Sequence, residues 1–167
     1  MSSVHSPFLY TPAQRARRDA SVWTRVQGIL APLQFLIFLG SLYLVIRSLQ
    51  TGAQTEWALA SVVFKTLVLY AIMVSGAIWE KVVFGQYLFA PAFFWEDMVS
   101  LVVLALHTVY LWAWWQGRWN SVELLWLALT AYVTYAINAA QYIRKLRQAR
   151  LQRQPRHVPS ANAQVSL

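Results

Sequence analysis

The sequence contains no cysteine, and this absence removes several kinds of protein from consideration. A chain without cysteine cannot form disulfide bonds, thiolate zinc sites, iron–sulfur clusters or the attachment of c-type haem. Charged residues are also scarce, at 12% of the 167 residues against roughly 25% in soluble domains. The composition therefore excludes an ordinary soluble domain, and a hydrophobic content of 58% equally excludes a disordered chain.

Four apolar runs are each long enough to cross a bilayer, which requires about 20 residues. They cover about residues 26–46, 57–79, 93–115 and 122–143. Tryptophans crowd the ends of these runs, as they do in the aromatic belts of membrane proteins. The sequence therefore predicts an all-α fold, an integral membrane four-helix transmembrane bundle whose surroundings are the lipid bilayer.

The segment before the first run combines a helix start with a cluster of arginines. Thr11, Pro12 and Gln14 suit the N-cap, the first and the third position of a helix. We expect this helix to continue to about Arg25 and to lie on the membrane surface as a short N-terminal interfacial helix. One membrane domain is then expected over residues 11–154, between a flexible N-terminus at 1–10 and a disordered polar tail at 155–167.

The 14 Lys and Arg residues outnumber the 6 Asp and Glu residues and gather on one side of the predicted membrane. Four precede the first run, Lys81 lies in the connection at 80–92, and six lie between Arg144 and Arg156. The positive-inside rule places both termini and this connection in the cytoplasm of a multi-pass protein. Because the basic residues sit at the chain ends rather than in a patch interleaved with polar sequence, a nucleic-acid partner is not expected.

Three of the acidic residues gather around the connection between the second and third runs. Glu80 follows the second run, and Glu96 and Asp97 begin the third. The connection itself is too apolar and aromatic for a solvated loop, and it offers flat surfaces to a large planar ligand with polar handles. The residues assigned to binding such a ligand are Lys81, Phe84, Tyr87, Phe89, Phe93, Phe94 and Trp95.

Simpler interpretations of the same polar residues stay open. Glu96 and Asp97 suit the start of any helix, whose positive pole stabilises acids, and Glu80 with Lys81 suits a weak interfacial pair.

Further polar residues lie inside the predicted spans. His107 fits a structural hydrogen bond, a metal ligand or a proton relay. Lys65 either meets His107 or extends toward the interface. Asn138 and Gln141 either orient a carboxylate or a water, or link helices.

The central segment, residues 78–97, reads IWEKVVFGQYLFAPAFFWED and resembles the signature of the 2-vinyl bacteriochlorophyllide hydratases. The resemblance extends to LYTP at 9–12, QGILAP at 27–32 and LHT at 106–108, and it covers roughly residues 9–150. It implies hydration of the C3-vinyl group of a chlorophyllide-type tetrapyrrole to 1-hydroxyethyl, as a hydro-lyase of bacteriochlorophyll biosynthesis. The location implied is a bacterial cytoplasmic or intracytoplasmic photosynthetic membrane.

The resemblance also bears on cofactors and partners. It implies no cofactor beyond the magnesium of the substrate, and it makes other enzymes of the pathway candidate partners.

The roles of the site residues are inferred from their positions in the predicted helices. The catalytic residues expected are Glu80, Glu96, Asp97 and His107. Glu80, at the negative pole of its helix, is assigned as the acid, and Asp97 or Glu96, at a positive pole, as the base. His107 is assigned as a proton relay or a ligand to the substrate magnesium, and Asn138 as a substrate contact.

Two other classes of function stay open at this point. A non-catalytic tetrapyrrole carrier or pigment–protein assembly factor would use the same aromatic surfaces, but it would not need several carboxylates at one depth. A small proton-coupled transporter would place acids or broken helices near the middle of the membrane.

Overall fold

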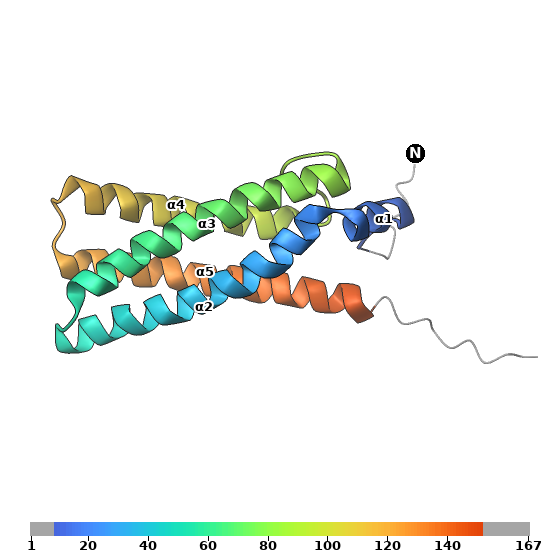
Figure 1. Ribbon diagram of the computed structural model, residues 1–167. Helices are drawn as coiled ribbons and strands as arrows, with labels where there is room; N and C mark the ends of the chain where they lie inside the picture. Colours follow the sequence, from blue (N-terminus) through green and yellow to red (C-terminus); the bar gives the residue numbers. More distant parts are fainter. Residues whose placement is uncertain (1–8, 152–167) are drawn as a thin grey trace, which may run out of the picture.

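A computed structural model describes residues 9–151, and helices are the regular elements of that part of the chain. A short helix, α1 (Pro12–Ala20), precedes four long ones: α2 (Val22–Thr51), α3 (Thr55–Phe84), α4 (Phe94–Gln116) and α5 (Ser121–Leu151) (Figure 1). Each long helix is long and apolar enough to cross a membrane. The predicted four-helix membrane fold is confirmed, while most of the predicted flexible N-terminus and the polar tail at 155–167 lie outside the described residues.

The start of α1 is the predicted one, but its end is not. Thr11 Oγ1 accepts the Gln14 N–H at 3.3 Å, and Gln14 Oε1 accepts the Thr11 N–H at 2.9 Å. The prediction that this helix continues to Arg25 is wrong, because Ser21 has an extended backbone and interrupts it. The Ser21 Oγ instead caps α2 by accepting the Trp23 N–H at 3.2 Å.

The connection between α3 and α4 is shorter than the predicted segment 80–92. The helix α3 continues past the apolar run as far as Phe84, and Gly85 ends it in the left-handed conformation with φ of 89°. Apolar runs mark the part of a helix that lies in hydrocarbon, whereas the helix itself ends where the backbone is capped. Glu80 and Lys81 are therefore helical residues, and the loop covers residues 85–93.

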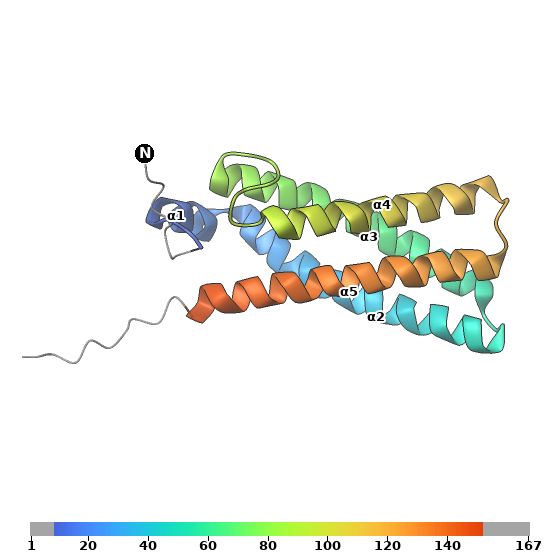
Figure 2. The ribbon, with the colours of Figure 1, turned by 180° about the vertical axis from the view of Figure 1, so that it is seen from behind.

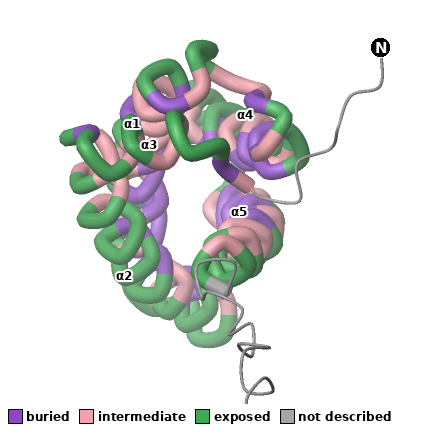
Figure 3. The backbone as a smooth tube through the Cα atoms, turned by 90° about the vertical axis from the view of Figure 1, so that its right-hand side faces the viewer, coloured by how far each residue is buried: buried purple, intermediate pink, exposed green. Residues whose placement is uncertain are grey.

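The four long helices pair as two antiparallel hairpins, α2 with α3 and α4 with α5 (Figures 1 and 2). Contacts are more extensive within each hairpin than between the two. Seen along the bundle, the buried residues lie on the inner faces of the helices (Figure 3). Many large apolar side chains are exposed on the outer faces, as expected for surfaces that meet lipid.

A second apolar cluster lies at the end of the bundle where α1, the 85–93 loop and the C-terminal part of α5 come together (Figure 2). Tyr10 is buried there, with its ring 5.8 Å from that of Phe84 and 6.3 Å from that of Phe93. The Arg18 guanidinium lies over the Tyr10 ring, 4.7 Å from its centre. The N-terminal segment thus packs onto the loop that follows Glu80.

Candidate active site

Two carboxyl side chains from different helices meet beneath the 85–93 loop. Glu80 lies in the last turns of α3, and Asp97 lies in the first turn of α4. Because the two helices are antiparallel and joined by a short loop, these turns lie side by side. Only 4% of Glu80 and 3% of Asp97 is exposed, and their carboxyl groups lie within hydrogen-bonding reach of one another.

The loop itself donates hydrogen bonds to this pair. The Ala90 N–H donates to Glu80 Oε2 at 3.2 Å, and the Phe89 N–H donates to Asp97 Oδ2 at 2.8 Å. Phe89 has φ of 61°, a conformation that L-residues rarely adopt. The two carboxyl groups therefore hold the loop in a specific conformation while the loop covers them.

Helix α5 completes the surroundings of Asp97. The Tyr142 hydroxyl donates to Asp97 Oδ1 at 3.3 Å, and its ring stacks on Phe93 at 6.1 Å. One turn deeper, the Asn138 amide donates to Ser100 Oγ at 2.9 Å. Asn138 therefore links α5 to α4, and its Oδ1 is buried without a hydrogen-bond partner in the described part of the chain.

Glu96 is turned away from the pair, toward α5. Its two carboxylate oxygens each lie 3.1 Å from Lys145 Nζ, and this ion pair is mostly shielded from solvent. Adjacent helix residues point about 100° apart, so Glu96 and Asp97 do not share one direction. The three predicted acids are thus neighbours, but only Glu80 and Asp97 form a pair.

The predicted aromatic contacts divide into an inner and an outer set. Phe93 is buried and Phe84 is partly buried, both within the cluster around Tyr10, and Phe89 is partly buried against Phe94 at 5.6 Å. The outer set is exposed beside the loop, and its members are Tyr87, Phe94 and Trp95. Lys81 is also exposed, with Nζ 2.8 Å from the Gly85 carbonyl oxygen and 5.2 Å from the Tyr87 ring centre.

His107 lies deeper in the bundle, ten residues along α4 from Asp97, or about 15 Å at the helical rise. Its Nδ1 lies 2.8 Å from the Val103 carbonyl oxygen, and its Nε2 lies 2.8 Å from Lys65 Nζ. Lys65 thus meets His107 rather than reaching the interface. Because both ring nitrogens are engaged, a bond from His107 to magnesium would require Lys65 to move.

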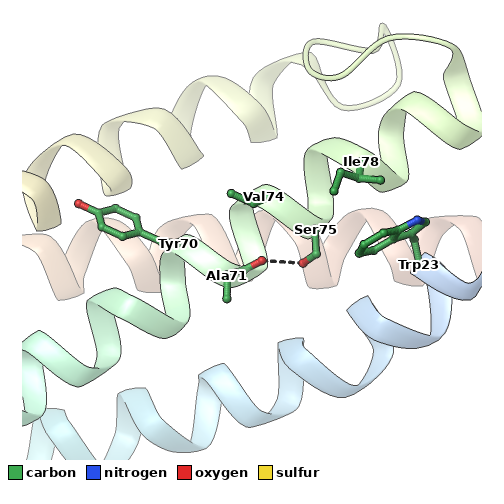
Figure 4. Close-up of a pocket in the computed structure, with 6 residues that line it drawn as sticks. All are labelled: Trp23, Tyr70, Ala71, Val74, Ser75 and Ile78. Atoms are coloured by element: carbon green, nitrogen blue, oxygen red, sulfur yellow. Dashed lines mark hydrogen bonds between the residues drawn. The ribbon is translucent and has the colours of Figure 1, made fainter.

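No metal cluster accompanies the pair in the part of the chain that the structure describes. No group of three or more His, Asp or Glu side chains there could hold a metal ion. An open apolar groove of about 410 Å³ runs along α3 from Tyr70 to Ile78, next to Trp23 (Figure 4). Glu80 and Asp97 are not among the residues that line it.

Sequence reasoning missed two residues of this site, Tyr142 and Lys145. A signal for both was present, because residues 138, 142 and 145 recur at spacings of four and three and so share one face of α5. Asn138 is itself a predicted substrate contact, and one of its expected roles is to orient a carboxylate. The face that contains it was therefore the place to look for partners of Asp97 and Glu96.

The fold and the site together define a small four-span membrane protein with a buried carboxyl pair at one end. A family model described as 2-vinyl bacteriochlorophyllide hydratase matches residues 10–148. A relative of that name from Rhodobacter capsulatus is 64% identical over 144 residues, 86% of this chain and 84% of the relative. Another from Cereibacter sphaeroides is 63% identical over 143 residues, 86% of this chain and 89% of the relative.

No solved structure is significantly similar to the chain. The family match and the two relatives span most of its length, and the chain belongs to the 2-vinyl bacteriochlorophyllide hydratase family. It is therefore an enzyme of the hydro-lyase class with a role in bacteriochlorophyll biosynthesis.

Proposed function

We propose that this enzyme adds water to the C3-vinyl group of a chlorophyllide or bacteriochlorophyllide and that Glu80 and Asp97 perform the proton transfers. The observation that carries the proposal is the contact between these two buried carboxyl groups, which belong to different helices. A carrier of the same pigment would have no use for such a pair. The name shared by the relatives supports the substrate class.

The reaction needs one proton donor and one proton acceptor. Glu80 donates a proton to the terminal vinyl carbon, which becomes a methyl group, and the adjacent carbon becomes a cation conjugated with the macrocycle. A water molecule forms a bond to that carbon while Asp97 removes one of its protons, which leaves the 1-hydroxyethyl product. Proton transfers by positioned groups of this kind each contribute roughly 10²–10⁴ in rate.

The hydrogen bonds around the pair support this division of roles. Asp97 accepts from the Phe89 N–H and from the Tyr142 hydroxyl, and two donors stabilise an anion. Glu80 accepts from the Ala90 N–H alone, so it is the better place for the proton that the pair shares. Glu96 is held by Lys145 and is assigned no proton transfer.

The contact between the two groups also closes the catalytic cycle. After turnover Asp97 carries a proton and Glu80 has lost one. A proton shift from Asp97 to the neighbouring Glu80 restores the starting state, and no proton has to come from bulk water. The exposed rings of Tyr87, Phe94 and Trp95 give the macrocycle an apolar approach from the bilayer to the loop.

The test is to incubate membranes that contain the protein with a 3-vinyl chlorophyllide in water labelled with heavy oxygen, without oxygen gas or reductant. The product should gain one labelled water. Glu80→Gln keeps an acceptor for the Ala90 N–H but removes the proton, so hydration should fall roughly 10²–10⁴-fold. Hydration by the Asp97→Asn protein should fall by a similar factor.

Glu96→Gln should retain most activity, because this residue performs no proton transfer. Glu56→Gln, at the opposite end of the bundle, is the matched control and should behave as wild type. Hydration at the wild-type rate by Glu80→Gln membranes contradicts the assignment of the acid, and a requirement for oxygen or reductant contradicts the reaction.

A further inference from the structure

A second group of polar side chains lies deep in the bundle, and the proposed proton transfers do not use it. Lys65 and His107 are both fully buried, and Gln34 is only 1% exposed. Lys65 lies ten residues from the start of α3 and nineteen from its end, so its nitrogen is far from both ends of the span. Polar groups at this depth are costly unless they are paired or functional.

Lys65 has more donors than residues 9–151 offer acceptors for it. Its Nζ carries three N–H donors, and within that part of the chain it makes a hydrogen bond to His107 Nε2 at 2.8 Å. Its other neighbours are the faces of the Tyr132 and Tyr135 rings, at 5.1 Å and 4.2 Å. The ion pairs among residues 9–151 join Arg18 to Asp19 and Lys145 to Glu96, and neither includes Lys65.

Gln34 adds a second, independent observation at the same level. Among the described residues, neither its amide nitrogen nor its amide oxygen has a hydrogen-bond partner, although both are buried. Two hydrogen bonds between the antiparallel helices α2 and α3 show which of their residues lie at the same depth, because Gln27 bonds Ser75 and Ser41 bonds Ser61. Gln34 is midway between Gln27 and Ser41 in the chain. Its depth therefore corresponds to that of residue 68 on α3, within one turn of Lys65.

The unpaired groups at this level call for a ligand with an acceptor oxygen. Asn138 Oδ1 and Gln141 Oε1 on α5 are also buried without partners among residues 9–151, but Asn138 bonds Ser100 and so lies nearer the carboxyl pair. Buried polar atoms in native proteins are nearly always paired, so the amide of Gln34, within one turn of the level of Lys65, indicates a missing partner. Because the surroundings are lipid and apolar side chains, that partner must have an apolar body that carries the oxygen into the bundle.

We infer that Lys65, oriented by His107, and Gln34 form a binding site for an acceptor oxygen on the edge of the tetrapyrrole remote from the reacting vinyl group. This inference rests on the proposed function. Asp97 and His107 are about 15 Å apart along α4, a distance comparable to the width of the macrocycle. The macrocycle would lie between the two hairpins, which contact each other less than the helices within each one do.

The experiment measures binding rather than turnover, with purified protein in lipid nanodiscs and a 3-vinyl chlorophyllide titrated by fluorescence. Lys65→Met and Gln34→Leu should each weaken binding, and the loss for Lys65→Met should be roughly tenfold to a hundredfold. Gln34→Leu removes buried polar atoms without partners, so the melting temperature of the ligand-free protein should stay the same or rise. Lys65→Met also leaves His107 Nε2 without its partner, so affinity is the decisive measurement for that variant.

Gln27→Leu is the matched control on the same helix. Its amide is paired with Ser75 and with the Ile72 carbonyl oxygen, so this substitution should lower the melting temperature and leave the affinity unchanged. A purely structural role for Lys65 and Gln34 predicts a lower melting temperature with unchanged affinity for both variants. If Gln34→Leu lowers the melting temperature, or if Lys65→Met binds the pigment with wild-type affinity, the inference is wrong.

Two analogues identify the oxygen. One has the propionate side chain replaced by a propyl group, and the other has the ring ketone reduced to a methylene group, so each lacks one acceptor oxygen. The effect of Lys65→Met should shrink for whichever analogue lacks the acceptor that Lys65 contacts. An equal effect for the pigment and both analogues, or a fall in kcat with unchanged affinity, overturns the inference. Failure of the proposed function is seen separately, as absence of hydration by the wild-type protein.

Discussion

At the scale of single residues, Tyr142 offers a clean test of how Asp97 is held. Its hydroxyl donates to Asp97 Oδ1 at 3.3 Å, while its ring stacks on Phe93. Tyr142→Phe keeps the ring and removes the donor, which leaves the Asp97 anion less stabilised. We expect hydration about tenfold slower, equivalent to about 1.4 kcal/mol in the barrier, with nearly unchanged thermal stability.

The control for this substitution is Tyr70→Phe. The Tyr70 hydroxyl bonds Thr108 on an exposed face of the bundle, so its loss should leave the hydration rate as it is. A Tyr142→Phe protein with the full wild-type rate would show that Asp97 does not depend on this hydroxyl.

The sequence predicts only in part which acidic side chains lie together. The positions of Glu80 and Asp97 at adjoining helix ends followed from the apolar runs and the short connection between them. The direction of Glu96 did not, because it depends on Lys145, which is 49 residues away in the chain. The contact of Lys65 with His107 was foreseen as one alternative, but the unpaired amide of Gln34 needs the packed structure to be seen.

At the scale of elements, the 85–93 loop stores strain at Phe89. Its φ of 61° costs an L-residue roughly 1–2 kcal/mol, and glycine avoids this cost but loses roughly 0.5–1 kcal/mol to chain entropy. Phe89→Gly should therefore be more stable than Phe89→Ala by about 0.5–1 kcal/mol, although both lose the same ring. Thermal unfolding of the two variants in one detergent makes the comparison.

A more stable Phe89→Ala protein would mean that the loop does not hold residue 89 in the left-handed conformation.

The backbone strain at Phe89 could not be predicted from the sequence, because phenylalanine carries no signal for positive φ. Helix starts were easier to predict, since the capping pattern of Thr11 and Gln14 is local. The end of α1 at Ser21 was missed because the same serine type suits a helix interior, a surface or a cap.

At the scale of the whole molecule, the four spans and their order follow from hydrophobicity, but the pairing of the helices into two hairpins does not. Apolar side chains cover every face of these helices, so periodicity does not tell the lipid-facing side from the packed side. The packed sides are marked instead by polar residues, such as Ser41, Ser100 and His107. Polar residues are therefore the better guide to the interior of this bundle.

The orientation of the bundle in the membrane is a prediction that the absence of cysteine makes simple to test. Most of the 14 Lys and Arg residues lie at the end that holds the carboxyl pair, so the positive-inside rule places that end in the cytoplasm. The single-cysteine variants His5→Cys and Ser160→Cys should resist a membrane-impermeant thiol reagent added to intact cells. The variant Ala53→Cys, in the exposed turn between α2 and α3, should react with it. Labelling of either terminal cysteine from outside would reverse the topology and would put Glu80 and Asp97 on the periplasmic side.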